Sequence, residues 1–218
     1  IDEDTWYPFG DFIDLTIWTS KSVEFPLYLR VPEWSKNAKI LMNGEDLEAE
    51  AQASSYVVLK RVWSNGDQVR LELPQNIEVK TWSKLRNAVS VRRGPLWYSL
   101  KIGERWNRYG GTDEWPAFEI LPTTSWNYGL ALNPANPASS ISLITQKPPA
   151  YQPFTPEAAP IILRAKARRV PLWKEEKRMA GELPASPVQT NESLEDITLI
   201  PMGCARLRIA SFPTVLFK

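Results

Sequence analysis

Short segments of alternating apolar and polar residues are the feature of this sequence that most restricts its fold. Residues 13–17, 25–31 and 69–73 each place an apolar side chain at every second position. A period of two puts successive side chains on opposite faces of an extended backbone. Each segment therefore predicts a half-buried β-strand.

Turn-forming residues separate these segments. Asn43-Gly44 and Asn65-Gly66-Asp67 tolerate the positive φ angles that tight hairpin turns require. Strands and turns follow each other at intervals of about ten residues, which favours a sandwich or a barrel over a βαβ fold. The 19 prolines also disfavour long helices. We therefore predict an all-β fold.

The second half of the chain has a less regular pattern. Residues 103–160 are rich in aromatic residues, glycine and proline, and predict either long loops around a sheet or part of a second small sandwich. Alternation returns over residues 161–170 and predicts another strand. The polar stretch 174–195 predicts an exposed excursion, and residues 197–199 and 205–209 predict two closing strands.

The composition excludes several functional classes. The 26 basic and 25 acidic residues leave a net charge of +1, which gives no electrostatic basis for binding nucleic acid or an anionic membrane. The chain has no histidine and a single cysteine, Cys204, so a Ser-His-Asp triad and a cysteine-rich zinc site are ruled out within it. We expect no metal and no cofactor in this chain, and we expect Cys204 to be a small buried packing residue.

Ten tryptophans point instead to sugar handling or to core packing. An indole offers a large flat apolar face with a polar edge, which suits both roles. Trp106, Trp115, Trp126 and Tyr128 fall in the region predicted as loops, where sandwich proteins place binding residues. They form the candidate carbohydrate-binding set. The alternative is that these rings hold long loops against the sandwich.

Carboxylates within the same region leave one enzymatic class open. Glycosidases can operate with two carboxylates, one as acid and the other as nucleophile or base. Asp113, Glu114 and Glu119 lie among the aromatic residues. The sequence does not place any two of them across a cleft from each other.

A series of short motifs runs in order through nearly the whole chain. The motifs are Trp6-Tyr7-Pro8-Phe9-Gly10-Asp11, residues 25–34, Asn43-Gly44, residues 63–67 and 71–74, Arg93-Gly94-Pro95 with residues 96–100, Trp126-Asn127-Tyr128-Gly129, Arg169-Val170-Pro171-Leu172-Trp173, and residues 197–213. The ordered set resembles the region that follows the catalytic barrel in glycoside hydrolase family 127 (GH127), the β-L-arabinofuranosidase family.

The resemblance implies an (α/α)6 barrel followed by jelly-roll-like β-sandwich domains, of which this chain would be the sandwich portion. The first sandwich would take residues 1–102 and the second, with long aromatic-rich loops, residues 103–202. The last strand, at residues 203–213, could return to the first sandwich, although the alternation does not show that return. The family's cysteine nucleophile, glutamate and zinc site lie in the barrel, and no motif for them matches here, so we transfer no catalytic residue.

We therefore expect a non-catalytic C-terminal β-sandwich portion of a glycoside hydrolase. It would brace the catalytic barrel of the same polypeptide and contribute to the rim of the substrate cleft. The alternatives are a self-sufficient carbohydrate-binding module for plant-type oligosaccharides and a carboxylate-only glycosidase. The sequence indicates neither the sugar nor the cellular compartment.

Overall fold

The computed structural model describes residues 1–147 and 152–216, and there it consists of β-strands and short 3-10 turns. The all-β prediction is thus confirmed. No helix in the described residues is long and apolar enough to cross a membrane. The chain divides into two compact units, Ile1–Asn76 and Ile77–Lys218.

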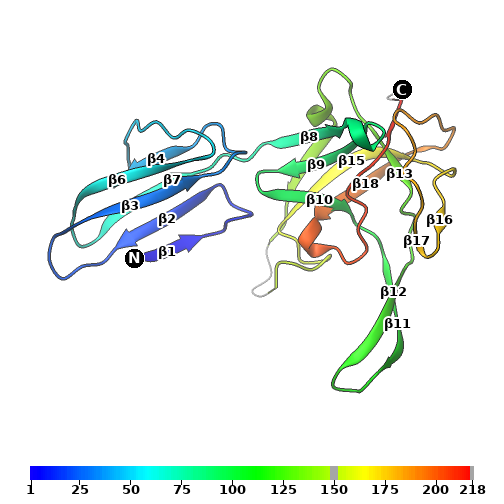
Figure 1. Ribbon diagram of the computed structural model, residues 1–218, viewed down its shortest axis with the longest axis horizontal. Coiled ribbons are helices and arrows are strands. Elements are labelled where there is room, and N and C mark those ends of the chain that lie inside the picture. Colours follow the sequence, from blue (N-terminus) through cyan, green and yellow to red (C-terminus); the bar gives the residue numbers. More distant parts are fainter. Residues whose placement is uncertain (148–151, 217–218) are drawn as a thin grey trace. The chain divides into compact units, whose positions relative to one another are not determined.

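The first unit contains two antiparallel sheets (Figure 1). The five-stranded sheet has the order β1 (Asp2–Thr5), β2 (Phe12–Ile17), β7 (Asp67–Glu72), β4 (Lys39–Met42) and β5 (Glu45–Asp46). The second sheet pairs β3 (Val23–Val31) with β6 (Ser55–Trp63). Side chains from both sheets, including Ile17, Val57 and Trp63, form one buried core. The strands predicted at 13–17, 25–31 and 69–73 are confirmed as β2, β3 and β7. The alternate apolar side chains of these segments face the core.

The two predicted turns have different roles. Asn43 and Gly44 adopt φ angles of 52° and 88° and connect β4 to β5, as a tight hairpin turn requires. The turn at Gly66 instead joins β6 to β7, which belong to different sheets, so it is not a hairpin. There the Ser64 N–H donates to Asp67 Oδ2 at 2.8 Å, and this bond lowers the pKa of Asp67.

An ion pair links two central strands of the five-stranded sheet. Arg70 Nε lies 2.7 Å from Asp14 Oδ1, and Arg70 Nη2 lies 2.8 Å from Asp14 Oδ2. The two residues are directly opposite each other on β2 and β7. Hydrogen bonds from the guanidinium lower the pKa of Asp14 below its usual value of 3.8.

We expect Asp14→Asn to lower the free energy of unfolding at about pH 7 by at most ~1 kcal/mol, because the pair is partly exposed. A lowered folded-state pKa stabilises the fold above the unfolded-state pKa, and the effect is lost as the pH falls through the folded-state pKa. Urea unfolding at about pH 7 and about pH 2 measures it. The difference from wild type should be present at the higher pH and absent at the lower one. A deficit of equal size at both pH values would contradict the assignment.

The second unit is built on an eight-stranded sheet that curls into a half-barrel. Along the sheet the order is β19 (Thr214–Val215), β13 (Tyr128–Ala131), β15 (Ile161–Arg169), β18 (Leu194–Pro201), β10 (Leu96–Leu100), β9 (Ala88–Arg93) and β8 (Ile77–Trp82), with β14 (Ile141–Thr145) also paired to β15. Strands β13 and β14 share one edge of β15, where β13 pairs with residues 167–169 and β14 with residues 161–165. The strands predicted at 161–170 and 197–199 are confirmed as β15 and β18.

Residues 103–122, expected as loops or as part of a second sandwich, form a long hairpin of β11 (Glu104–Gly111) and β12 (Pro116–Pro122). Figure 1 shows the hairpin extending away from the rest of its unit. Aromatic residues favour strands and pair across them, and the Trp106 and Phe118 rings meet edge to face at 5.4 Å. At the turn, Gly111 has a φ of 78° and leaves no room for a Cβ, which would lie 2.2 Å from the Trp115 carbonyl oxygen. The aromatic-rich loop prediction is therefore wrong over this segment.

The boundary between the units also differs from the expected one, after residue 102. Strands β8, β9 and β10 belong to the second unit, because β10 pairs with β18. Alternation marks these segments as strands, but it does not identify their partners.

The expected closing strand at 205–209 is irregular chain, in which the Ile209 carbonyl accepts bonds from Leu100 N and Ser99 Oγ. Strand β10 already pairs with β18 along one edge and with β9 along the other, so few of its backbone groups remain to pair with a further strand. Further along, Phe212 pairs with Val89 through two backbone bonds of 2.8 Å. The end of the chain thus joins β9 in the second unit.

Candidate carbohydrate-binding site

The four candidate sugar-contacting residues have different surroundings. Trp106 lies on β11 and is 46% exposed, Trp115 follows the hairpin turn and is 75% exposed, Trp126 is half-buried ahead of β13, and Tyr128 is buried on β13. In the described part of the chain, no ring contact joins two of the four. The structure therefore gives no single aromatic platform made of all four.

Trp106 is engaged by its neighbours. The Arg206 guanidinium lies 5.0 Å from the centre of its ring, and Phe118 contacts the ring edge to face. The indole N–H donates to Glu104 Oε2 at 3.2 Å. One face of this indole is thus covered by a cation.

Trp115 is held through its backbone and leaves its ring in solvent. Its N–H donates to Thr112 Oγ1 at 3.0 Å, and its carbonyl accepts from Thr112 N at 3.2 Å. These bonds close the turn, so the ring does not contribute to the hairpin core.

Tyr128 is part of the sheet interior. Its hydroxyl donates to Glu195 Oε2 at 2.8 Å. Burial, and then the bond to Glu195, raise the pKa of the phenol. Its buried ring and satisfied hydroxyl give Tyr128 a packing role in the structure.

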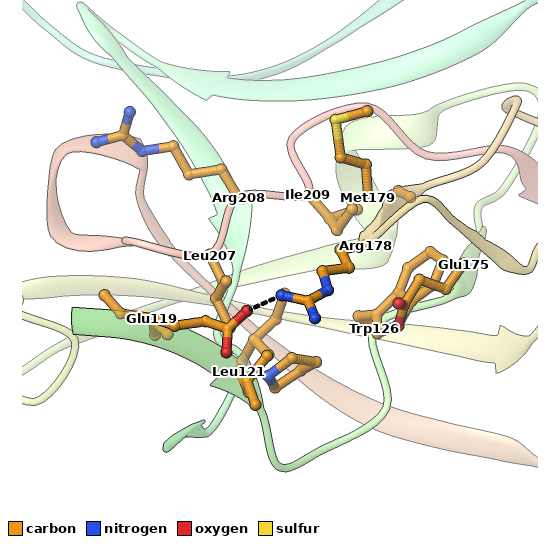
Figure 2. A pocket seen from close by; sticks show the side chains of 13 residues that line it. Glu119, Leu121, Trp126, Glu175, Arg178, Met179, Leu207, Arg208 and Ile209 are labelled. Atoms are coloured by element: carbon orange, nitrogen blue, oxygen red, sulfur yellow. Dashed lines mark hydrogen bonds and ion pairs between the residues drawn. The ribbon is translucent and has the colours of Figure 1, made fainter. Parts of the chain in front are cut away.

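Trp126 lines a cleft with a volume of 490 Å³ (Figure 2). We call it the Trp126 cleft. Glu119 and Leu121 enter it from β12, and Glu175 and Arg178 from a small hairpin formed by β16 (Glu175–Glu176) and β17 (Met179–Ala180). The remaining lining residues are Ile102, Ile120, Pro122, Met179, Ala180, Leu207, Arg208 and Ile209. Apolar surface and a few charged groups therefore meet in one concave site.

Trp126 is positioned by Trp173, whose ring meets it edge to face at 5.2 Å. The Trp173 indole N–H donates to the Gly181 carbonyl at 2.9 Å, which attaches the β16–β17 hairpin to the same residue. Asn127 Nδ2 donates to the carbonyls of Val170 at 3.1 Å and Trp173 at 3.2 Å. The cleft thus has a fixed aromatic wall.

Arg178 reaches the opposite wall. Its Nη1 lies 2.6 Å from Glu119 Oε1, so the pair joins the β16–β17 turn to β12 (Figure 2). The residue pattern does not mark Glu175 and Arg178, because they lie in a polar stretch expected to be an exposed excursion. Lys177 and Arg178 form the turn without the Asn-Gly signature that would have marked a hairpin.

The carboxylates do not support independent glycosidase chemistry. Asp113 pairs with Arg108 at 2.6 Å, and Glu119 pairs with Arg178. A glycosidase needs two carboxyl groups that flank the substrate, and of the three carboxylates singled out in the sequence only Glu119 lines the Trp126 cleft. Among the residues that the structure describes, no group of three or more potential His, Cys, Asp or Glu ligands could hold a metal ion.

Cys204 is buried, as expected, with 1% of its surface exposed. Its thiol lies 3.5 Å from the Pro153 carbonyl oxygen. Burial raises the pKa of the Cys204 thiol to about 11.

Because the thiolate is the reactive form, we expect iodoacetamide at about pH 8 to leave Cys204 unmodified in the folded chain. The same reagent in denaturant should modify it completely. Mass spectrometry of the intact chain distinguishes the two states. Equal modification rates in the folded and unfolded chain would show that the thiol is accessible.

Comparisons with known proteins show which proteins the chain resembles. Residues 1–75 match the family model described as "Beta-L-arabinofuranosidase, GH127 middle domain". A solved glycoside hydrolase is 25% identical with a TM-score of 0.61, and the match covers 98% of this chain and 32% of that one. A GH127 β-L-arabinofuranosidase from Geobacillus stearothermophilus is 22% identical with a TM-score of 0.60, covering 98% and 30%. A further GH127 β-arabinofuranosidase is 18% identical with a TM-score of 0.63, covering 97% and 31%.

No curated protein sequence matches the chain. The chain spans about a third of the length of the solved structures it matches. The resemblance to GH127 is confirmed, and the first unit coincides almost completely with the matched middle domain. Residues 1–75 are thus similar to the GH127 middle domain, and the whole chain is similar to a β-rich part of solved glycoside hydrolases.

Proposed function

We propose that this chain packs against the other domains of a multidomain GH127 polypeptide, here called the parent, and braces its catalytic barrel. The chain corresponds to only 30–32% of the matched structures, which supports a parent with other domains for it to contact. We further propose that each unit is a jelly-roll-like sandwich. The core shared by the two sheets of the first unit supports that arrangement.

The outer face of the β3–β6 sheet carries this proposal. Tyr28, Tyr56, Val58 and Val62 point away from the core of the first unit and are 60%, 62%, 46% and 55% exposed. Tyr28 lies directly opposite Val58, and Tyr56 lies opposite Arg30. We call this surface the outer β3–β6 face.

The same face carries the exposed charged residues Glu24, Arg30 and Lys60, so large apolar and charged side chains alternate over it. The solvent face of an antiparallel sheet is normally polar, and the four large apolar residues depart from that pattern. Clustered exposed apolar side chains mark interaction sites, and tyrosine is enriched at protein interfaces. In the described part of the chain, β3 and β6 pair only with each other, so both outer strand edges are also open. Another domain of the same polypeptide is the occupant that these features support.

The double variant Tyr28→Glu/Val58→Lys tests the proposal. The opposite charges face each other across the strands, so the isolated chain should keep its stability to within about 0.5 kcal/mol. In the parent, the same change should lower the melting temperature of the chain's transition in scanning calorimetry, because two charges would be buried at the interface.

Leu172→Lys is the matched control, because Leu172 is 60% exposed and lies outside the outer β3–β6 face. Leu172→Lys should leave the melting temperature of the chain's transition in the parent unchanged. If the double variant melts like wild type in the parent, the outer β3–β6 face is not the bracing surface.

A further inference from the structure

We propose that the Trp126 cleft binds a neutral oligosaccharide. Trp126 would stack against one sugar ring, and Glu119, Glu175 and Arg178 would hydrogen-bond its hydroxyl groups. This site lies wholly within the second unit and does not depend on the outer β3–β6 face.

A second hollow, with a volume of 450 Å³, adjoins the Trp126 cleft and shares Pro122, Trp126 and Glu175 with it. Its other lining residues are rich in hydroxyl and amide groups and comprise Thr123, Thr124, Ser125, Asn127, Arg169, Pro171, Trp173 and Lys174. Ligand sites commonly measure about 300–1,000 Å³. The two hollows together reach the upper part of this range, which leaves room for more than one sugar unit. Trp126 stands where the two meet, which suits a chain of sugars that passes over its ring.

The chemistry of the cleft fits a sugar. An indole offers an apolar face for the C–H surface of a pyranose or furanose ring, while carboxylate and guanidinium groups accept and donate hydrogen bonds in a plane. The Trp126 cleft contains two carboxylates, Glu119 and Glu175, and two guanidiniums, Arg178 and Arg208. In Figure 2 the Arg208 guanidinium lies away from the Arg178–Glu119 pair. The adjoining hollow adds two cations, Arg169 and Lys174. Both carboxylates, however, line the Trp126 cleft itself, where they would repel an acidic sugar, so the surroundings of Trp126 favour a neutral ligand.

The backbone of the β16–β17 turn adds an independent indication. Lys177 and Arg178 have φ angles of 52° and 64°, in the left-handed region that favours glycine. A two-residue hairpin turn normally uses Asn-Gly here, so the observed pair is strained. The strained turn places Arg178 on Glu119 across the cleft. Strain of this kind is typical of ligand-contacting segments.

Isothermal titration of the chain with cellotetraose, xylotetraose and arabinotetraose tests the proposal, with tetragalacturonate as the acidic counterpart. We expect at least one neutral tetrasaccharide to bind with a Kd between about 10 μM and about 1 mM. Tetragalacturonate should bind more weakly. If it binds more tightly than all three neutral probes, or if no neutral probe binds, the proposal is overturned.

Variants locate the site. Because Trp126 also packs on Trp173, its replacement could disturb folding, so Glu175→Gln and Arg178→Ala are the primary variants. Each removes a charged hydrogen-bonding group and should weaken binding about tenfold or more. Trp115→Ala removes an exposed indole outside the cleft and should bind like wild type, as should Tyr28→Glu/Val58→Lys. Loss of binding in Trp115→Ala, with wild-type binding in Arg178→Ala, would move the site to the hairpin turn and overturn the proposal.

The double variant Lys177→Asn/Arg178→Gly separates folding from binding. An Asn-Gly turn relieves the strain, so the melting temperature should rise by about 2–4 °C while binding falls about tenfold or more. A variant that gains stability and still binds like wild type would show that Arg178 has no role in holding the ligand.

Discussion

Replacing Trp63 with alanine is expected to lower the free energy of unfolding of the first unit by about 3–5 kcal/mol. Trp63 is fully buried and stacks on Phe25 with a ring separation of 5.5 Å. Its indole N–H also donates to the Phe25 carbonyl on β3 at 2.9 Å. Removing the ring therefore leaves this carbonyl without its hydrogen-bond donor. Urea unfolding followed by near-ultraviolet circular dichroism measures the loss.

Trp18→Ala is the matched control. Trp18 is 57% exposed, and its indole N–H donates to Asp2 Oδ2 at 2.8 Å on the surface. Its loss should lower the free energy of unfolding by less than about 1 kcal/mol. Similar losses for the two variants would mean that Trp63 is not the central packing residue of this unit.

Replacing Phe212 with alanine is expected to destabilise the second unit by a similar amount, about 3–5 kcal/mol. Phe212 has no exposed surface, and its backbone is fixed to Val89 on β9 by two hydrogen bonds. The substitution keeps those bonds and removes the ring, so a cavity remains where the end of the chain closes the unit. Urea unfolding again provides the measurement.

Leu216→Ala is the matched control, because it also shortens an apolar side chain near the C-terminus, but one that is 50% exposed. It should change the free energy of unfolding by no more than about 0.5 kcal/mol. A Phe212→Ala variant as stable as Leu216→Ala would show that the segment ending at Phe212 does not close the second unit.

The residue pattern was sufficient to predict strands but not their partners. Alternation identified residues 161–170 as a strand because burial of Leu163 and Ala167 depends only on local geometry. The pairing of β10 with β18 joins residues about a hundred positions apart, and nothing in either segment specifies the other. The domain boundary was therefore expected at residue 102, whereas the structure divides the chain after Asn76.

The candidate site was predictable only in part. Trp126 was singled out because of its residue type, and the structure places it in a cleft. The same criterion selected Tyr128, which is buried and bonded to Glu195, because composition does not reveal burial. Arg178 could not be predicted, since its role depends on an unusual turn that brings it to Glu119 from a distant part of the chain.

Hydroxyl-radical footprinting of Tyr28 and Tyr56 tests most directly whether the outer β3–β6 face contacts the rest of the parent. Both rings are more than half exposed in this chain, so both should be modified readily when the chain is alone. In the parent, their modification should fall several-fold, while Tyr109, which is 75% exposed on the β11–β12 hairpin, should remain reactive. Equal modification of Tyr28 and Tyr56 in the isolated chain and in the parent would contradict the proposed bracing role.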